Sequence, residues 1–195
     1  MDVRSDPLQE ALLGVVLERT EATTAELVRV TRARCLDDGS FERVDAALRA
    51  QGWVLGVLMA AGGNDALLAR RERHGLAALV SVVDEGLRRD GRALARADRP
   101  VPELGATGWE LPWALGALLW CAGNELPAGG ELAWELAPAP GGGAELVLQS
   151  ASAPPPWLAP ALAERVPALE VELGAGAWRA RAPAGWLAFE REAAP

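Results

Sequence analysis

Few side chains in this 195-residue chain combine the types and the spacing that catalysis or metal binding requires. The one histidine, His74, and the two cysteines, Cys35 and Cys121, are far apart in the sequence and do not form the ligand pattern of a zinc site. We interpret His74 as a solvated residue near the start of a helix. Because Cys121 lies between Trp120 and Ala122 in an apolar run, it is expected to be an inert thiol of the core.

Two other groups of residues have types that occur in active sites. Four carboxylates cluster around an expected loop between two helices: Asp37, Asp38, Glu42 and Asp45. Helix capping and solvation explain this cluster better than acid–base catalysis, because no titratable partner in a distinct environment accompanies it. The glycine runs at 127–130 and 140–144 precede strands, whereas a phosphate-binding loop leads into a helix N-terminus. Both runs are expected to be turns.

The composition and the charge exclude several classes of function. All 19 basic residues are Arg, and 27 acidic residues give a net charge of −8, so no nucleic-acid partner is expected. The N-terminus lacks the apolar run of a signal peptide. The longest apolar stretch, residues 111–123, is shorter than the roughly 20 residues that a membrane-spanning helix needs. The sequence therefore predicts a soluble, cytoplasmic protein without membrane insertion.

Residues 1–63 predict two long amphipathic helices, because apolar residues recur at helical spacing with charged residues between them. Joined by a short loop, the two helices form an antiparallel hairpin, and a second copy of the chain would complete a four-helix bundle. The expected boundary residues are Asp6 as N-cap, Pro7 as first helical residue, Gly39 as stop, Ser40 as second N-cap, and Gly62 with Gly63 as second stop.

Residues 64–195 predict an α/β sandwich with mostly antiparallel strands and helices on one face. The expected helices are one that starts near His74 and ends at Gly91, the apolar helix Trp109–Gly123, and a short one within the Pro-rich segment 151–167. A loop is expected at 99–108. Strands are expected at 92–98, 130–138, 143–150, 168–176, 177–185 and 186–192.

The order and the lengths of these elements resemble the dimerisation and catalytic core of a bacterial histidine kinase, over roughly Asp6 to Glu192. The segments that carry the resemblance are 41–63 as second hairpin helix, 74–98 as linker helix and first strand, 111–136 as Asn-box helix with its following strand, and 167–192 as closing strands. The resemblance implies an α+β fold: a helical-hairpin dimerisation domain at 1–63, and a Bergerat-like ATPase-type sandwich domain at 64–195. The chain is also similar to dimeric histidine phosphotransfer proteins.

The chain departs from the family's pattern wherever that pattern carries chemistry. Where the first helix should present the phosphoacceptor His, the nearest residue is Asp6. The Asn-box positions that hold Mg²⁺ and phosphates in the family are Ala117 and Cys121, and Asn124 lies one turn late.

The element that recognises adenine, Asp-x-Gly-x-Gly in the family, corresponds to Ser150, Ala151 and Ala153, followed by prolines that stiffen the loop. Only residues 157–167 separate this element from the closing strands, so the family's lid is missing.

These departures predict a pseudokinase without catalytic, cofactor-binding or metal-binding residues. We expect a homodimer that acts through protein–protein interaction in two-component signalling, either by binding a response regulator or by modulating an active histidine kinase. One alternative is a residual ATP- and Mg²⁺-dependent kinase or phosphotransferase that uses His74. Another is an unrelated ligand-binding domain that shares only the architecture.

Overall fold

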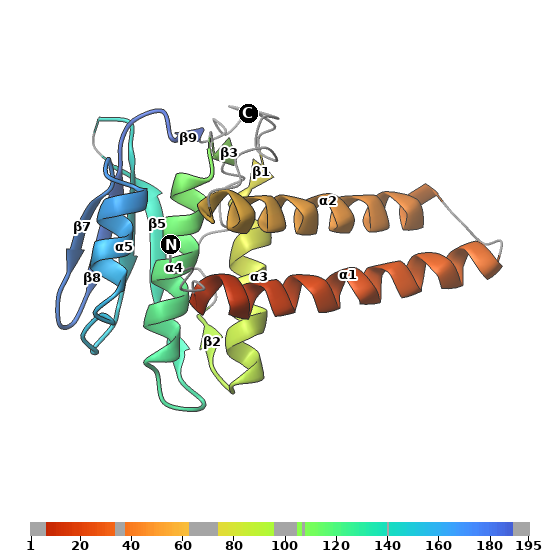
Figure 1. The fold of residues 1–195 in the computed structure, drawn as a ribbon, viewed down its shortest axis with the longest axis horizontal. Coiled ribbons are helices and arrows are strands. Elements are labelled where there is room, and N and C mark those ends of the chain that lie inside the picture. The colour runs from red at the N-terminus through yellow and green to blue at the C-terminus, as the bar shows by residue number, and fades with distance from the viewer. Residues whose placement is uncertain are drawn as a thin grey trace, which may run out of the picture.

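The computed structural model describes residues 7–33, 38–62, 74–95, 105–106, 108–139 and 141–188. Within them, two long helices, α1 (Pro7–Ala33) and α2 (Asp38–Ala61), form a hairpin that projects from a body of helices and sheets (Figure 1). The helices of the body are α3 (Leu76–Arg89), α4 (Glu110–Asn124) and α5 (Leu158–Arg165). The predicted combination of helices with mainly antiparallel sheet, the α+β class, is confirmed at this level.

The hairpin follows the predicted pattern at its two ends. α1 begins at Pro7, whose fixed φ and missing N–H suit the first turn of a helix. α2 ends at Ala61, and Gly62 forms the turn after it, as predicted. Asp6 and Gly63 lie outside the described residues.

The predicted boundaries of the loop between the two helices are wrong. α1 ends at Ala33, well before Gly39, and α2 begins at Asp38, so Gly39 and Ser40 belong to the first turn of α2. Glycine is therefore a weak stop signal when the next helix starts immediately.

The prediction that His74 begins a helix is also wrong. His74–Gly75 form the strand β1, and α3 starts at Leu76. β1 pairs with β3 (Gly105–Ala106), which lies in the segment predicted as a loop, and β3 pairs with β9 (Leu187–Ala188). The last closing strand therefore belongs to this small sheet and not to the sheet of the other two. Strands of two residues have no alternation that a sequence could reveal, because distant pairing partners determine them.

The largest sheet has the strand order β5–β6–β8–β7, and all its neighbours are antiparallel. A separate parallel pair joins β2 to β4, so the strand predicted at 92–98 is reduced, among the described residues, to two residues. The bounds are β2 (Ala93–Leu94), β4 (Glu131–Leu132), β5 (Trp134–Pro138), β6 (Ala144–Leu148), β7 (Glu170–Leu173) and β8 (Trp178–Ala182).

The inner face of the large sheet is apolar. Leu146 and Leu148 of β6 and Trp178, Ala180 and Ala182 of β8 are all buried. α4 contacts both β6 and α5, and α5 lies in the Pro-rich segment where a short helix was expected. The helices and this face together form the core of the body.

The outer face of the same sheet carries alternating charge. Arg179 and Arg181 of β8 are exposed, and the register places Glu172 and Glu170 of β7 opposite them. Arg181 also donates its Nε to Glu145 of β6 at 3.0 Å, and this hydrogen bond is the main reason that the pKa of Arg181 is raised. Opposite charges on neighbouring strands stabilise the solvated face.

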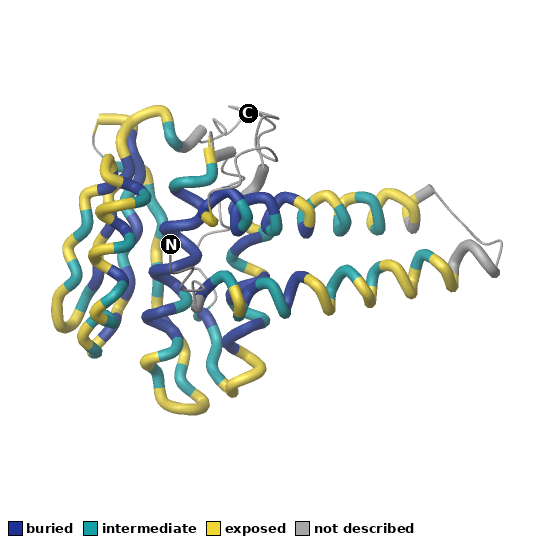
Figure 2. Tube along the Cα trace, viewed as in Figure 1, coloured by how far each residue is buried: buried dark blue, intermediate teal, exposed yellow. Residues whose placement is uncertain are grey.

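The base of the hairpin is part of the core of the body. Among the apolar residues larger than alanine, four of α1 and four of α2 are at most 7% exposed, and both helices contact α3 and α4. Burial falls off along the hairpin toward its tip (Figure 2). The core thus continues across the predicted boundary between residues 63 and 64, and the division into two domains stays a prediction. These eight residues are Leu8, Leu12, Val15, Val16, Trp53, Val54, Val57 and Leu58, and Gln51, Ala60 and Ala61 of α2 are buried as well.

One helical segment among the described residues, Phe41–Ala61, is long and apolar enough to cross a membrane. Its mean hydropathy of 1.2 is modest, and 44% of the window is buried within the fold. A helix that packs in a core passes the same test, so this segment is weak evidence for a membrane span. Cytoplasmic location stays a prediction.

Candidate functional site

The helix that the resemblance places at the nucleotide site, α4, runs through the centre of the fold. All residues from Leu111 to Leu119 are buried, as are Cys121, Ala122 and Gly123. α4 lies between the large sheet and the hairpin (Figure 1), and it contacts α1, α2, α3 and α5. A helix that is apolar on all sides is typical of a core.

Two glycines allow α3 and α4 to approach each other closely. A Cβ built at Gly86 of α3 would lie 2.7 Å from the ring of Trp120, and one at Gly123 of α4 would lie 2.5 Å from Leu87. These distances are too short for real Cβ contacts, so the two larger side chains occupy the space that the glycines leave. α4 is therefore fixed tightly against α3.

The two Asn-box positions are inside this core. Ala117 is 0% exposed and Cys121 is 5% exposed. Neither side chain offers the oxygen ligand that Mg²⁺ prefers. Asn124, one turn further along, is half-buried and donates its Nδ2 to the backbone oxygen of Trp120 at 3.0 Å. Its amide is engaged with its own helix.

The segment that corresponds to the adenine-recognition element packs against the β7–β8 turn. Ser150 is 3% exposed, and its backbone oxygen accepts a hydrogen bond from the N–H of Gly176 at 2.9 Å. The indole N–H of Trp178 donates to the backbone oxygen of Ser152 at 3.3 Å. Ala151 and Ala153 are exposed. These contacts attach the segment to the sheet on both sides of Ala151.

Two hollows beside α4, both lined by described residues, are too small for a nucleotide. The one between α4 and the sheet has a volume of about 10 Å³ and is lined by apolar side chains that include Leu115, Leu146 and Ala180. A second, of about 60 Å³, lies beside Glu110 and Trp186. Sites for small molecules usually measure on the order of 300–1,000 Å³. The first hollow holds at most one water, and the carboxylate in the second disfavours a phosphate.

Metal ligands do not gather anywhere in the described part of the chain, where no group of three or more His, Cys, Asp and Glu side chains could hold an ion. Of the carboxylates near the hairpin loop, Asp45 pairs with Arg49 at 2.6 Å and Glu42 is exposed. Asp38 is the first residue of α2, and Asp37 and Cys35 lie outside the described residues.

The resolved pKa shifts among the described residues belong to exposed ion pairs. A hydrogen bond with Arg29 lowers the pKa of Glu26, and the same contact raises the pKa of Arg29. Asp84 raises the pKa of Arg88, which donates its Nε to that carboxylate at 2.7 Å. Catalytic acids and bases are usually shifted by burial as well as by a charged partner. These two pairs therefore support helices, as the pair of Arg181 and Glu145 supports the large sheet.

The hairpin contains a polar layer at the point where it leaves the body. Gln51 of α2 is 7% exposed and bridges two hydroxyls of α1: it accepts from Thr20 and donates to Thr23, each at 3.2 Å. Beyond this layer the hairpin exposes large apolar side chains, with Val28 at 43% and Phe41 at 57%. We call residues 20–33 and 38–51 the arm.

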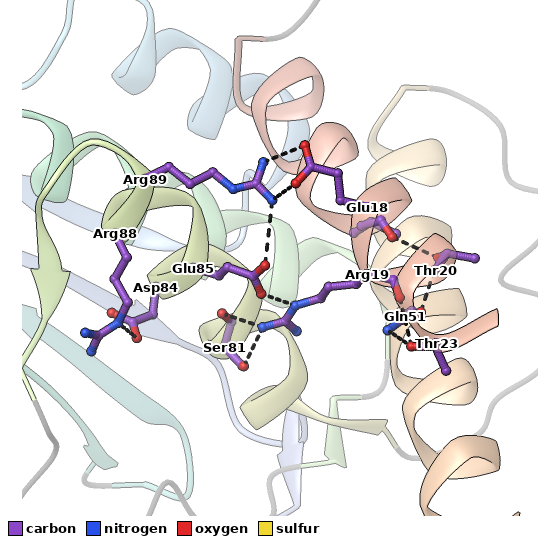
Figure 3. A network of polar contacts seen from close by, with 11 residues as sticks. Glu18, Arg19, Thr20, Thr23, Gln51, Ser81, Asp84, Glu85, Arg88 and Arg89 are labelled. Atoms are coloured by element: carbon purple, nitrogen blue, oxygen red, sulfur yellow. Dashed lines mark hydrogen bonds and ion pairs between the residues drawn. The ribbon is translucent and has the colours of Figure 1, made fainter. Parts of the chain in front are cut away.

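Next to this polar layer, where the hairpin leaves the body, ion pairs connect α1 to α3 (Figure 3). Arg89 donates to both carboxylate oxygens of Glu18, at 2.6 and 3.3 Å. Arg19 donates from its Nε to Glu85. Its Nη2 donates to the backbone oxygen of Ser81 at 3.1 Å and to the hydroxyl of Ser81 at 2.9 Å. Arg89 also lies 3.6 Å from Glu85. No local pattern in the sequence reveals this network, because its pairs join helices that are distant along the chain.

Comparisons with known proteins assign no family. No model of a known protein family matches the chain, and no curated protein matches it. A solved structure, the histidine kinase domain of the Erythrobacter litoralis EL346 blue-light activated histidine kinase, matches over 90% of this chain and 94% of that one. The identity is 14% and the TM-score is 0.43. The likeness is therefore a broad one, and we transfer no residue's role from it.

Proposed function

We propose that this chain is a catalytically degenerate histidine-kinase-like protein that acts through protein–protein interaction in two-component signalling. The observation that carries the proposal is the arm, which projects from the body with Val28 and Phe41 exposed on it and Leu17 exposed just before it. Two helices alone rarely bury enough apolar surface to be stable, so an arm of this kind calls for further helices. The order of the elements along the sequence, which resembles a kinase core, supports the signalling context.

The environment of α4 supports the absence of nucleotide turnover. Ala117 and Cys121 are buried among apolar side chains, and Asn124 hydrogen-bonds to its own helix. Ser150, at the position of the carboxylate that reads adenine in the family, is also buried. A nucleotide at this place would have to displace part of the core.

A homodimer is the first assembly that we propose. A second copy would bring another arm, and two arms packed side by side would form a four-helix bundle. Because the base of the hairpin is already covered by α3 and α4, the contact between copies would lie along the arm. A response regulator or an active histidine kinase would bind along the same helices.

The first test is a titration with Mg²⁺-ATP and Mg²⁺-ADP in which the melting temperature is measured at each nucleotide concentration. We expect no shift at millimolar nucleotide. If the nucleotide concentration were roughly five times the Kd of a site, binding would add about 1 kcal/mol to the free energy of unfolding. The melting temperature of a chain of this size would then rise by about 2–4 °C. A saturable shift of that size would contradict the proposal. The kinase alternative would then be tested through His74→Ala and a search for acid-labile phosphate.

The second test is the oligomeric state, measured by sedimentation equilibrium. We expect a dimer for the unmodified chain and a dissociation constant raised at least about tenfold by Phe41→Glu, because a buried anchor at an interface contributes more than 1 kcal/mol. Ala163→Glu, on the exposed side of α5, is the control and should leave the dimer intact. A monomer at all concentrations would remove the homodimer from the proposal.

A further inference from the structure

The attachment of α1 to the body changes character within one helical turn. Up to Val16 the attachment is apolar, with Leu12, Val15 and Val16 at most 1% exposed. From Glu18 onward it consists of charged groups, and the next side chains, Thr20 and Thr23, hydrogen-bond to Gln51 of α2. We call Glu18 and Arg19, with their partners on α3, the neck of the hairpin. The neck is thus held by ion pairs, whereas the base is held by apolar contacts.

The charges at the neck are arranged symmetrically between the two helices. α1 contributes one acid and one base, Glu18 and Arg19, and α3 contributes one acid and one base, Glu85 and Arg89. Each base faces the acid of the other helix, as Figure 3 shows. The pairs are partly solvated, with side-chain exposures of 26% and 37% in one pair and 36% and 66% in the other. Partly solvated pairs are weak individually and are screened by salt.

Directly beyond the neck, α1 has a segment that bends easily. The hydroxyls of Thr23 and Thr24 donate to the backbone oxygens of the residues four positions earlier, at 2.8 and 2.7 Å. Thr20 shares its one hydroxyl hydrogen between the backbone oxygen of Val16 at 2.8 Å and Gln51 Oε1 at 3.2 Å. Such back-bonding weakens the carbonyl's bond in the helix and often bends it. Three instances within two turns, next to the ion pairs of Glu18 and Arg19 with α3, place a soft point where the arm leaves the body.

We propose that Glu18, Arg19, Glu85 and Arg89 form a releasable charge latch that fixes the angle between the arm and the body. When the latch opens, α1 bends at Thr20–Thr24 while the apolar base stays in place. High ionic strength opens the latch, and so does a partner that offers a competing charge at the neck. The proposal concerns the geometry of a single chain and does not depend on the arm's binding a particular partner.

Charge reversal allows a test in which net charge and composition stay constant. Reversing α1 alone (Glu18→Arg with Arg19→Glu) places like charges opposite each other, and so does reversing α3 alone (Glu85→Arg with Arg89→Glu). Reversing both helices restores opposite charges at every pair. The three variants share the same net charge as the unmodified chain, so a difference between them reports the pairing alone.

The readout is the distribution of distances between spin labels at Glu42→Cys, on the exposed side of the arm, and Ala128→Cys, in the exposed turn after α4. Cys35→Ser removes one native thiol, Cys121 is shielded by burial, and an excess of unlabelled protein leaves only distances within one chain. We expect one narrow distribution for the unmodified chain and for the double reversal. Each single-helix reversal should add a second population of distances. The unmodified chain should show the same second population in 1 M salt, because the Debye length is then about 3 Å.

A distribution that is identical in all variants and at all salt concentrations would overturn the latch. Broadening in the double reversal equal to that in the single-helix reversals would overturn it as well, because pairing would then be irrelevant. Circular dichroism and melting temperature identify any variant that fails to fold, and the salt titration of the unmodified pairs tests the proposal without any charge change. The distances are measured within one chain and without nucleotide, so failure of the latch and failure of the proposed function are distinguishable.

Discussion

Leu12→Asp should unfold the hairpin and the body together and lower the free energy of unfolding by about 4 kcal/mol or more. Leu12 is 0% exposed and belongs to the core that α1 shares with the body. The substitution removes a buried aliphatic side chain, which typically costs about 2–5 kcal/mol, and places an unpaired carboxylate in the same space. Because one core joins the two parts, a single cooperative transition is expected, with circular dichroism and tryptophan fluorescence changing at the same denaturant concentration.

The matched control is Val28→Asp, which makes a similar change in the same helix at a residue that is 43% exposed. It should change the free energy of unfolding by less than about 0.5 kcal/mol, as surface substitutions usually do. Both variants are measured in the Phe41→Glu background, so that assembly through the arm does not contribute. Two separate transitions, or equal effects of the two substitutions, would contradict the shared core.

Ala117→Asn, which restores the family's residue at the Asn-box position, should destabilise the protein by about 3 kcal/mol and create no nucleotide site. The Asn side chain would enter a fully buried position beside apolar neighbours. An amide without a hydrogen-bond partner costs about 1–3 kcal/mol there, and the extra volume costs a similar amount. The measurement is urea unfolding, followed by the Mg²⁺-ATP titration on the folded variant.

Ala163→Asn is the control, because it makes the same change on the exposed side of α5. Only the lower helix propensity of Asn should matter there, and it should lower the free energy of unfolding by about 0.5 kcal/mol. If Ala117→Asn were as mild as this control, or if it conferred a saturable nucleotide-dependent shift in melting temperature, the position would border a site and not the core.

The sequence indicated the elements whose residues form long patterns. The start of α1 at Pro7, the end of α3 at Gly91 and the position of α4 follow from local chemistry: a ring that suits the first turn, a glycine at φ 72°, and an uninterrupted apolar run. The same apolar run already placed Ala117 and Cys121 in a core, which the structure bears out for both residues.

What the sequence did not indicate depends on contacts between distant residues. His74 and Gly75 form a strand only because Gly105 and Ala106 lie beside them. The two glycines between α3 and α4, and the ion pairs between α1 and α3, acquire their roles only when the helices are brought together. Single residues on different helices produce no periodic pattern, so no reading of one segment could find them.

The outer strand of the large sheet has a consequence for assembly. β7 is the last strand on its side, and Glu170 and Glu172 point to the outer face. If a second copy continued the sheet by pairing its own β7 antiparallel about Val171, Glu170 of each copy would lie opposite Glu172 of the other. Like charges directly opposite each other destabilise such a pair. In this register the β7 edge of the sheet therefore repels its own copy, which disfavours edge-to-edge pairing through β7.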